Sequence, residues 1–158
     1  MIIASYAALA LALQIMENIL LPPQIVWLRF GIANIITIIL LYKFNINIAV
    51  KVVIVRTVAA SLLLGTFLSP PFWMSFGGGV ASAVCMGLIL KTPFKNYLGV
   101  IGLSIIGAMV HNLVQLIIAF AFLQFGISFL SYILPIIVIS SIIFGSITGY
   151  ISYKVLIP

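Results

Sequence analysis

The chain has 158 residues, of which 65% are hydrophobic and only 5% are charged. Soluble domains carry about 25% charged residues, so these charges are too few to cover a water-facing surface, and we expect an integral membrane protein surrounded by the lipid bilayer. Seven Lys and Arg residues stand against one acid, Glu17. The bases lie singly between apolar runs, which argues against a nucleic-acid-binding patch.

Apolar stretches of about 20 residues, the length that crosses a bilayer, occur repeatedly along the sequence. The six predicted spans cover approximately Ile2–Leu21, Gln24–Tyr42, Ile48–Leu68, Phe72–Leu90, Tyr97–Leu123 and Ser131–Leu156. No span has the charged face that a long helix in water would need. We therefore predict an all-α membrane protein with six transmembrane helices, and we expect residues 1–158 to form a single integral membrane domain.

The first predicted span carries a stripe of small residues, Ala4, Ala8 and Ala12. Small residues at every fourth position lie on one helix face and let another helix approach closely. This stripe is the best candidate for contact with another protein, with internal packing as the alternative. Glycines recur in spans four to six, where we expect most of them to pack helices within the bundle.

The loops that separate the spans predict an orientation. Lys43, Lys91 and Lys95 lie in the loops after spans two and four, and Lys154 ends span six. All four therefore lie on one side of the membrane, which the positive-inside rule makes the cytoplasm. We expect both termini on the cytoplasmic side.

Polar and ionisable side chains inside the spans are the candidate substrate-binding residues. Such groups are expensive in a membrane and usually face a protein interior or a cavity. The candidates are Glu17, Arg29, Asn34, Arg56, His111, Asn112 and Gln115. His111 and Gln115 are four residues apart and so share one face of a helix.

Two intramembrane arginines with one carboxylate leave an excess of positive charge, which predicts a small anionic or amphipathic substrate. Arg29 and Arg56 would bind negative charge, and the amide and imidazole side chains would orient the ligand. Glu17 would hold Arg29 or receive a cationic part of the ligand. The alternatives are a structural Glu17–Arg29 ion pair, an interhelical hydrogen bond for His111, and helix–helix contacts for Asn34 and Gln115.

Catalytic and metal-binding patterns are missing from the sequence. With no Asp, one Glu and one His, the chain has too few ligands for a Mg²⁺–diphosphate or zinc site, and no Ser–His–Asp arrangement can form. We expect neither enzymatic activity nor a resident metal or cofactor. Trp27 and Trp73 are predicted interfacial anchors, with lids that stack on a ring of the ligand as the alternative. Pro70-Pro71 and Gly77–Gly79 are expected to flank a loop that gates the site.

Three motifs carry a resemblance to a known family: Gly31-Ile-Ala-Asn34 followed by Thr37 and Tyr42, Gly65-Thr-Phe-Leu-Ser-Pro-Pro71, and Ile106-Gly107 leading to His111-Asn112 and Gln115. In these motifs the chain resembles the Gx transporters, also known as heptaprenyl diphosphate synthase component I. That family is similar to the substrate-binding S components of energy-coupling factor (ECF) transporters of prokaryotic cell membranes.

The resemblance implies an S-component-like bundle with its substrate site in the outer half. It also implies that the stripe of Ala4, Ala8 and Ala12 docks to a transmembrane coupling subunit, which works with two ATPases. Two alternatives stay open. The chain could be a membrane subunit of a prenyl diphosphate synthase or redox assembly, with a separate catalytic subunit, or a stand-alone secondary carrier with His111 and Glu17 as proton relays.

Overall fold

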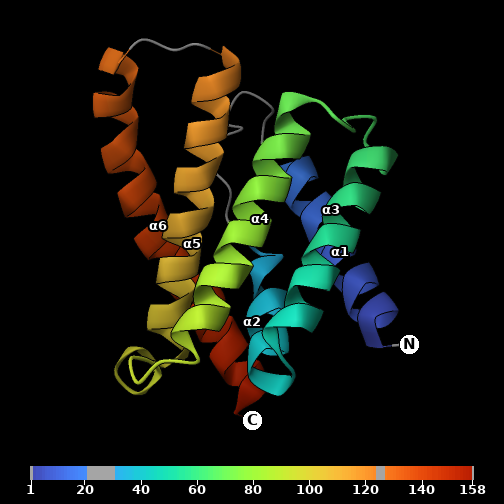
Figure 1. The fold of residues 1–158 in the computed structure, drawn as a ribbon, viewed down its shortest axis with the longest axis vertical. Coiled ribbons are helices and arrows are strands. Elements are labelled where there is room, and N and C mark those ends of the chain that lie inside the picture. Colours follow the sequence, from blue (N-terminus) through green and yellow to red (C-terminus); the bar gives the residue numbers. More distant parts are fainter. Residues whose placement is uncertain (1, 21–30, 124–126, 158) are drawn as a thin grey trace.

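The computed structural model describes residues 2–20, 31–123 and 127–157, and in these ranges every regular element is an α-helix (Figure 1). The helices are α1 (Ile2–Leu20), α2 (Asn34–Lys43), α3 (Ile46–Leu63), α4 (Pro70–Ile89), α5 (Lys95–Leu123) and α6 (Ile127–Leu156). All except α2 are long and apolar enough to cross a membrane. The predicted all-α, multi-pass membrane protein is confirmed.

The second predicted span differs most from the structure. The prediction of a continuous helix over Gln24–Tyr42 is wrong at residues 31–33, because these residues form a turn before α2 begins at Asn34. Gly31 has a φ of 69°, a left-handed conformation that ends or interrupts a helix and suits glycine. The described helix has 10 residues, too few to cross a bilayer alone. The rest of this predicted span lies outside the described residues.

Two predicted boundaries around the third and fourth spans also need correction. Helix α3 ends at Leu63 rather than Leu68, because the following turn contains Gly65 and Leu68 with positive φ. The pair Pro70-Pro71 opens α4, where a proline without an N–H is readily accommodated. The glycines at 77–79 therefore lie inside α4, and the predicted gating loop between them and the prolines does not exist.

The last two helices begin differently from the prediction. Gly99 has φ 58° and ψ −174°, so α5 is interrupted there and most of its residues follow this position. Helix α6 starts at Ile127, four residues before the predicted Ser131. Pro135 consequently lies in the interior of α6 and not in its first turns.

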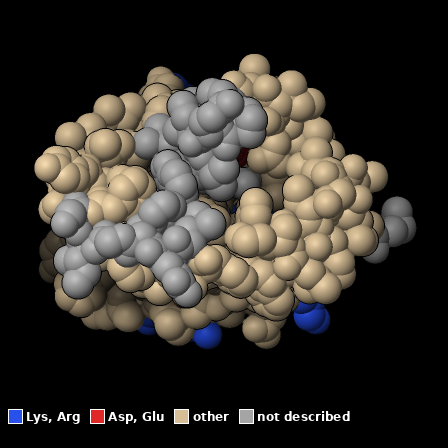
Figure 2. Space-filling model, turned by 90° about the horizontal axis from the view of Figure 1, so that it is seen from above, with Lys and Arg blue, Asp and Glu red and all other residues tan. Residues whose placement is uncertain are grey.

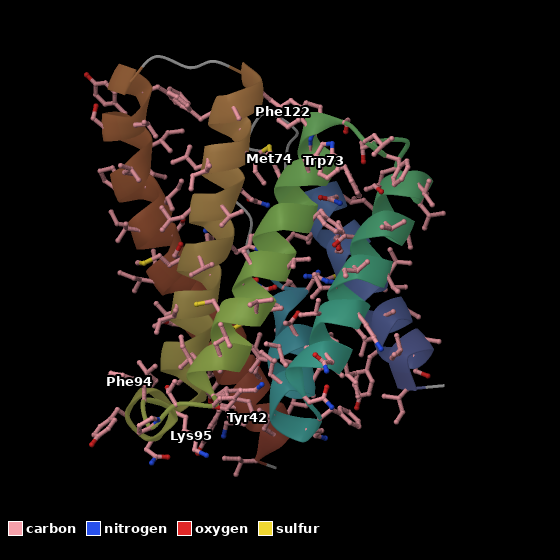
Figure 3. The ribbon with its side chains drawn as sticks, in the orientation of Figure 1. Tyr42, Trp73, Met74, Phe94, Lys95 and Phe122 are labelled. Carbon is pink, nitrogen blue, oxygen red and sulfur yellow. The ribbon has the colours of Figure 1, made fainter. Side chains whose placement is uncertain are left out.

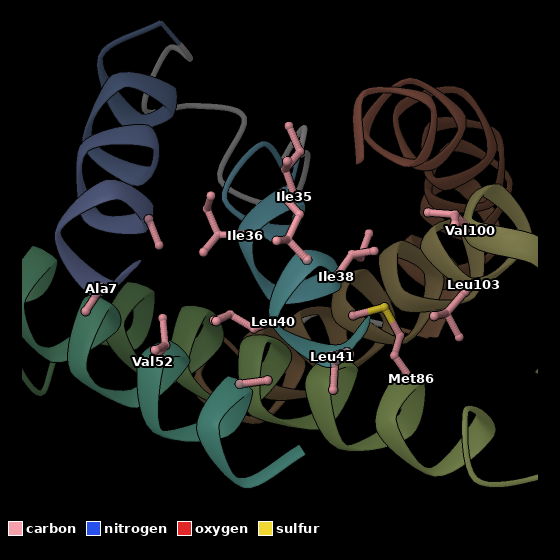
Figure 4. Packing of buried hydrophobic residues seen from close by; sticks show 13 residues of the cluster. Ala7, Ile35, Ile36, Ile38, Leu40, Leu41, Val52, Met86, Val100 and Leu103 are labelled. Atoms are coloured by element: carbon pink, nitrogen blue, oxygen red, sulfur yellow. The ribbon is translucent and has the colours of Figure 1, made fainter. Parts of the chain in front are cut away.

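Helix α2 lies at the centre of the bundle, and each of its residues from Asn34 to Leu41 is buried. Helix α2 packs against all five other helices, as Figure 4 shows for Ile38 beside Met86 of α4 and for Leu40 beside Val52 of α3. Helices α5 and α6 pack through glycine: a Cβ atom at Gly145 would lie 2.7 Å from the Cα of Ile105. The predicted internal packing role of the glycines is confirmed at this position.

The lysines of the loops gather at one end of the bundle. Lys43 ends α2, Lys91 follows α4, Lys95 begins α5 and Lys154 lies in the last turn of α6. Figure 1 shows these helix ends together at the bottom, whereas the α3–α4 turn lies at the top. Figure 3 shows Phe94 and Lys95 at the lower end and Trp73 near the upper end.

The upper end has a different surface. Outside the residues drawn in grey, Lys and Arg atoms appear only at its rim (Figure 2). The same view shows red atoms in a hollow near the centre, and the chain contains a single acidic residue. Trp73 is 40% exposed at this end, consistent with the predicted interfacial anchor, while Trp27 lies outside the described residues.

Candidate functional site

A polar pocket lies among five helices toward the end of the bundle that is opposite the lysines. It is lined by Gln14, Glu17, Gly31, Ala33, Asn34, Arg56, Thr57, Ser75 and His111. All of these except Gly31 and Ala33 have polar side chains. At 1.5 Å per residue, Glu17 is about 5 Å from the end of α1 and Arg56 about 10 Å from the end of α3, so the pocket is deep among apolar helices.

The two charged lining residues are held by neutral partners. Glu17 is 3% exposed and accepts a hydrogen bond from the backbone N–H of Gly31 at 2.8 Å. Arg56 is 4% exposed and donates from Nη1 to Oε1 of Gln14 at 3.3 Å. Charges are buried at a high cost in free energy unless hydrogen bonds stabilise them. These bonds therefore help to keep a carboxylate and a guanidinium beside one pocket.

The turn before α2 places backbone groups at the same pocket. The positive φ of Gly31 directs its N–H to Glu17, while its carbonyl accepts from the N–H of Asn34 at 2.8 Å. Helix α2 therefore begins at the pocket wall, and Asn34 is 5% exposed there. A helix N-terminus carries partial positive charge, which adds to the field of Arg56.

His111 is oriented by Gln115, one turn further along α5. The Nε2 atoms of the two side chains are 3.0 Å apart, so the amide donates to a ring nitrogen that accepts. Gln115 is fully buried and does not line the pocket, and its Oε1 has no hydrogen-bond partner among the described residues. Gln115 thus lies behind His111 and fixes the ring that faces the pocket.

Asn112 points away from the pocket. Its Nδ2 donates to the hydroxyl of Ser141 on α6 at 3.0 Å. A second contact joins the same two helices, since the hydroxyl oxygens of Ser104 and Thr148 are 3.0 Å apart. The geometry of Asn112 is that of an interhelical hydrogen bond.

The structure therefore brings together four of the predicted substrate-binding residues, namely Glu17, Asn34, Arg56 and His111. Gln115 supports them, Asn112 faces α6, and Arg29 lies outside the described residues. Sequence reasoning missed Gln14, although it precedes Glu17 by three residues and so shares its helix face. It also missed Thr57 and Ser75, because single hydroxyl residues in apolar helices give no distinctive pattern.

The pocket is small as it stands. The centres of water molecules can occupy about 20 Å³ of it, and one buried water needs roughly 10–15 Å³. It therefore accommodates one water molecule, and anything larger requires the lining side chains to move. Among the described residues there is no group of three His, Cys, Asp or Glu side chains that could hold a metal ion.

The alanine stripe lies on the outer face of α1. Ala4, Ala8 and Ala12 are exposed, whereas Ala7 and Ala10 are buried in the bundle. The stripe is thus free of internal packing, in contrast to the glycines of α5 and α6.

Comparison with known proteins gives one family. The family model described as heptaprenyl diphosphate synthase component I matches residues 6–155, a range that includes the whole pocket lining. No curated protein and no solved structure matches the chain.

Proposed function

The chain belongs to the heptaprenyl diphosphate synthase component I family, and we propose that it is the membrane-embedded substrate-binding component of an importer of the energy-coupling factor type. It would capture a small polar or amphipathic molecule, including one with a negatively charged group, from the outer side of the membrane. It would do so by binding and not by catalysis.

The pocket is the observation that carries this proposal. Buried ionisable groups within membrane helices are rare, and they mark substrate pathways more often than ordinary packing. Here Glu17 and Arg56, from two different helices, line one pocket together with Asn34 and His111. Arg56 would bind acceptor or negatively charged atoms, and Asn34 and His111 would orient the ligand.

The chemistry of the chain supports binding over synthesis. Prenyl diphosphate synthases hold Mg²⁺ with aspartate-rich motifs, whereas this chain contains no Asp. The pocket offers hydrogen-bond donors and acceptors but a single carboxylate. If the family description applies to an assembly that contains this chain, the catalytic residues would belong to another subunit.

The exposed alanine stripe supports a partner within the membrane. Ala4, Ala8 and Ala12 would let a helix of a transmembrane coupling subunit approach α1 closely. Two ATPases bound to that subunit would supply the energy for transport. In this arrangement the lysine-bearing end faces the cytoplasm, with both termini, and the pocket lies in the outer half of the cell membrane.

A second candidate is a membrane subunit of a heptaprenyl diphosphate synthase without transport activity. The family description favours it, and so does the segment from Lys91 to Tyr97 at the lysine-bearing end, where every residue is exposed. A soluble catalytic subunit would then dock at this end and not along α1.

The test is isolation of the tagged chain from its native membrane in mild detergent, with identification of the co-purifying proteins. We expect a transmembrane subunit together with two ATPases, and an untagged strain provides the control. A prenyl synthase subunit without ATPases would overturn the transport proposal in favour of the second candidate. Uptake by the chain alone in liposomes without ATP would instead identify a secondary carrier.

A further inference from the structure

Resting on the proposed function, we infer that the ligand enters the pocket with a compact polar group that carries both a hydrogen-bond donor and an acceptor. The donor faces Glu17 and the acceptor faces Arg56. We expect the captured group to be neutral or zwitterionic, such as a cyclic amide, a ureide or an amino acid head, and not a simple anion.

The first reason is that these two side chains have fixed hydrogen-bonding roles. An ionised carboxylate only accepts hydrogen bonds, and a guanidinium only donates them. The other polar lining groups can do both, since Asn34 has an amide and Thr57 and Ser75 have hydroxyl groups. The adaptable groups therefore fit many ligands, whereas Glu17 and Arg56 determine which ligand chemistry is accepted.

The second reason is the charge of the pocket. Among its described lining residues there are one carboxylate and one guanidinium, so their formal charges cancel. Both are at least nine-tenths buried, where charges interact more strongly than in water. A simple anion would be attracted by Arg56 but repelled by Glu17, whereas a donor–acceptor pair satisfies both.

The third reason is size. The space open to water centres, about 20 Å³, holds about one water molecule. Only a compact group can enter with modest movement of the side chains. The backbone N–H of Gly31 donates to Oε1 of Glu17, so a ligand donor would share this carboxylate with the turn before α2.

The test uses the purified full-length chain in detergent and the ultrafiltrate of its source cells and growth medium as the probe. Molecules retained after equilibrium dialysis are identified by mass spectrometry, and the affinity of the retained molecule is then measured. The variants are Glu17→Gln and Arg56→Gln. Lys51→Gln, which removes an exposed charge from the same helix as Arg56, is the matched control.

We expect a retained molecule with adjacent donor and acceptor atoms, and a loss of affinity of about tenfold or more in each pocket variant. Lys51→Gln should bind normally. A retained simple anion, or a Glu17→Gln variant that binds equally well or better, would overturn this inference while leaving the transport proposal intact. Retention of no molecule by the unmodified chain would overturn both. Thermal unfolding of each variant separates loss of binding from loss of folding.

Discussion

Gly78 determines how closely α4 approaches the turn of α5 that carries His111. A Cβ atom at this position would lie 2.9 Å from the backbone oxygen of His111 and 3.0 Å from Cγ of Gln115. Backbone atoms cannot move aside as a flexible side chain can. We therefore predict that Gly78→Ala destabilises the protein by about 1–3 kcal/mol and shifts His111, lowering ligand affinity. Thermal unfolding in detergent and a binding assay would measure the two effects.

The neighbouring glycine provides the control. A Cβ atom at Gly77 would meet the Cδ1 atom of Ile118 at 2.5 Å, and that atom is the flexible end of a side chain. Gly77→Ala should therefore cost less stability than Gly78→Ala and leave ligand affinity unchanged. Equal effects of the two substitutions would show that the approach of α4 to His111 does not depend on Gly78.

The sequence predicted individual site residues where they interrupt apolar runs. Glu17, Arg56 and His111 are conspicuous because ionisable groups are rare inside membrane helices. What the sequence could not predict is the partner of each residue. The bond from Arg56 to Gln14 joins residues 42 positions apart, and Asn112 turns to Ser141 although His111 beside it faces the pocket.

Helix α1 presents two faces with different roles. Ala8 is exposed, while Ala7 beside it is 4% exposed and belongs to the core. We predict that Ala8→Leu prevents association with the proposed membrane partner, because the added side chain blocks close helix approach. Folding and ligand binding should persist, since the new side chain faces outward. Co-purification of partners and thermal unfolding would measure these effects.

Ala7→Leu is the matched control for that substitution. It adds the same atoms on the buried face, so it should lower stability by about 1–3 kcal/mol through overpacking. Normal partner association by Ala8→Leu would exclude the stripe from the docking surface. Loss of ligand binding in the same variant would show that this face of α1 also supports the pocket.

At the scale of whole helices, the lengths of the apolar stretches predicted the all-helical class well, but they predicted the ends of the helices less well. Three of the differences from the predicted spans involve Gly31, Gly65 and Gly99, all with positive φ. A hydropathy pattern does not distinguish a glycine that packs within a helix from one that interrupts it. The short α2 illustrates this, because its apolar sequence continues through the turn at Gly31.

At the scale of the whole molecule, charge is divided between two ends. The loop lysines lie at one end, and the polar pocket lies toward the other. The sequence predicted this division from the alternation of spans and loops alone. The proposed binding component would require this division, because the positive-inside rule would place the lysine-bearing end in the cytoplasm and the pocket toward the outside.

The single cysteine of the chain allows this orientation to be tested. Replacement of Cys85 by Ser gives a background without thiols, into which one cysteine is introduced at a time. The two substitutions are Leu64→Cys, in the turn after α3, and Asn96→Cys, near the start of α5. Both positions are exposed. In intact cells, a membrane-impermeant maleimide should label Leu64→Cys and not Asn96→Cys, and permeabilised cells should show labelling of both. The reverse pattern would place the pocket toward the cytoplasm, where it could serve a synthase assembly but could not capture a molecule from outside.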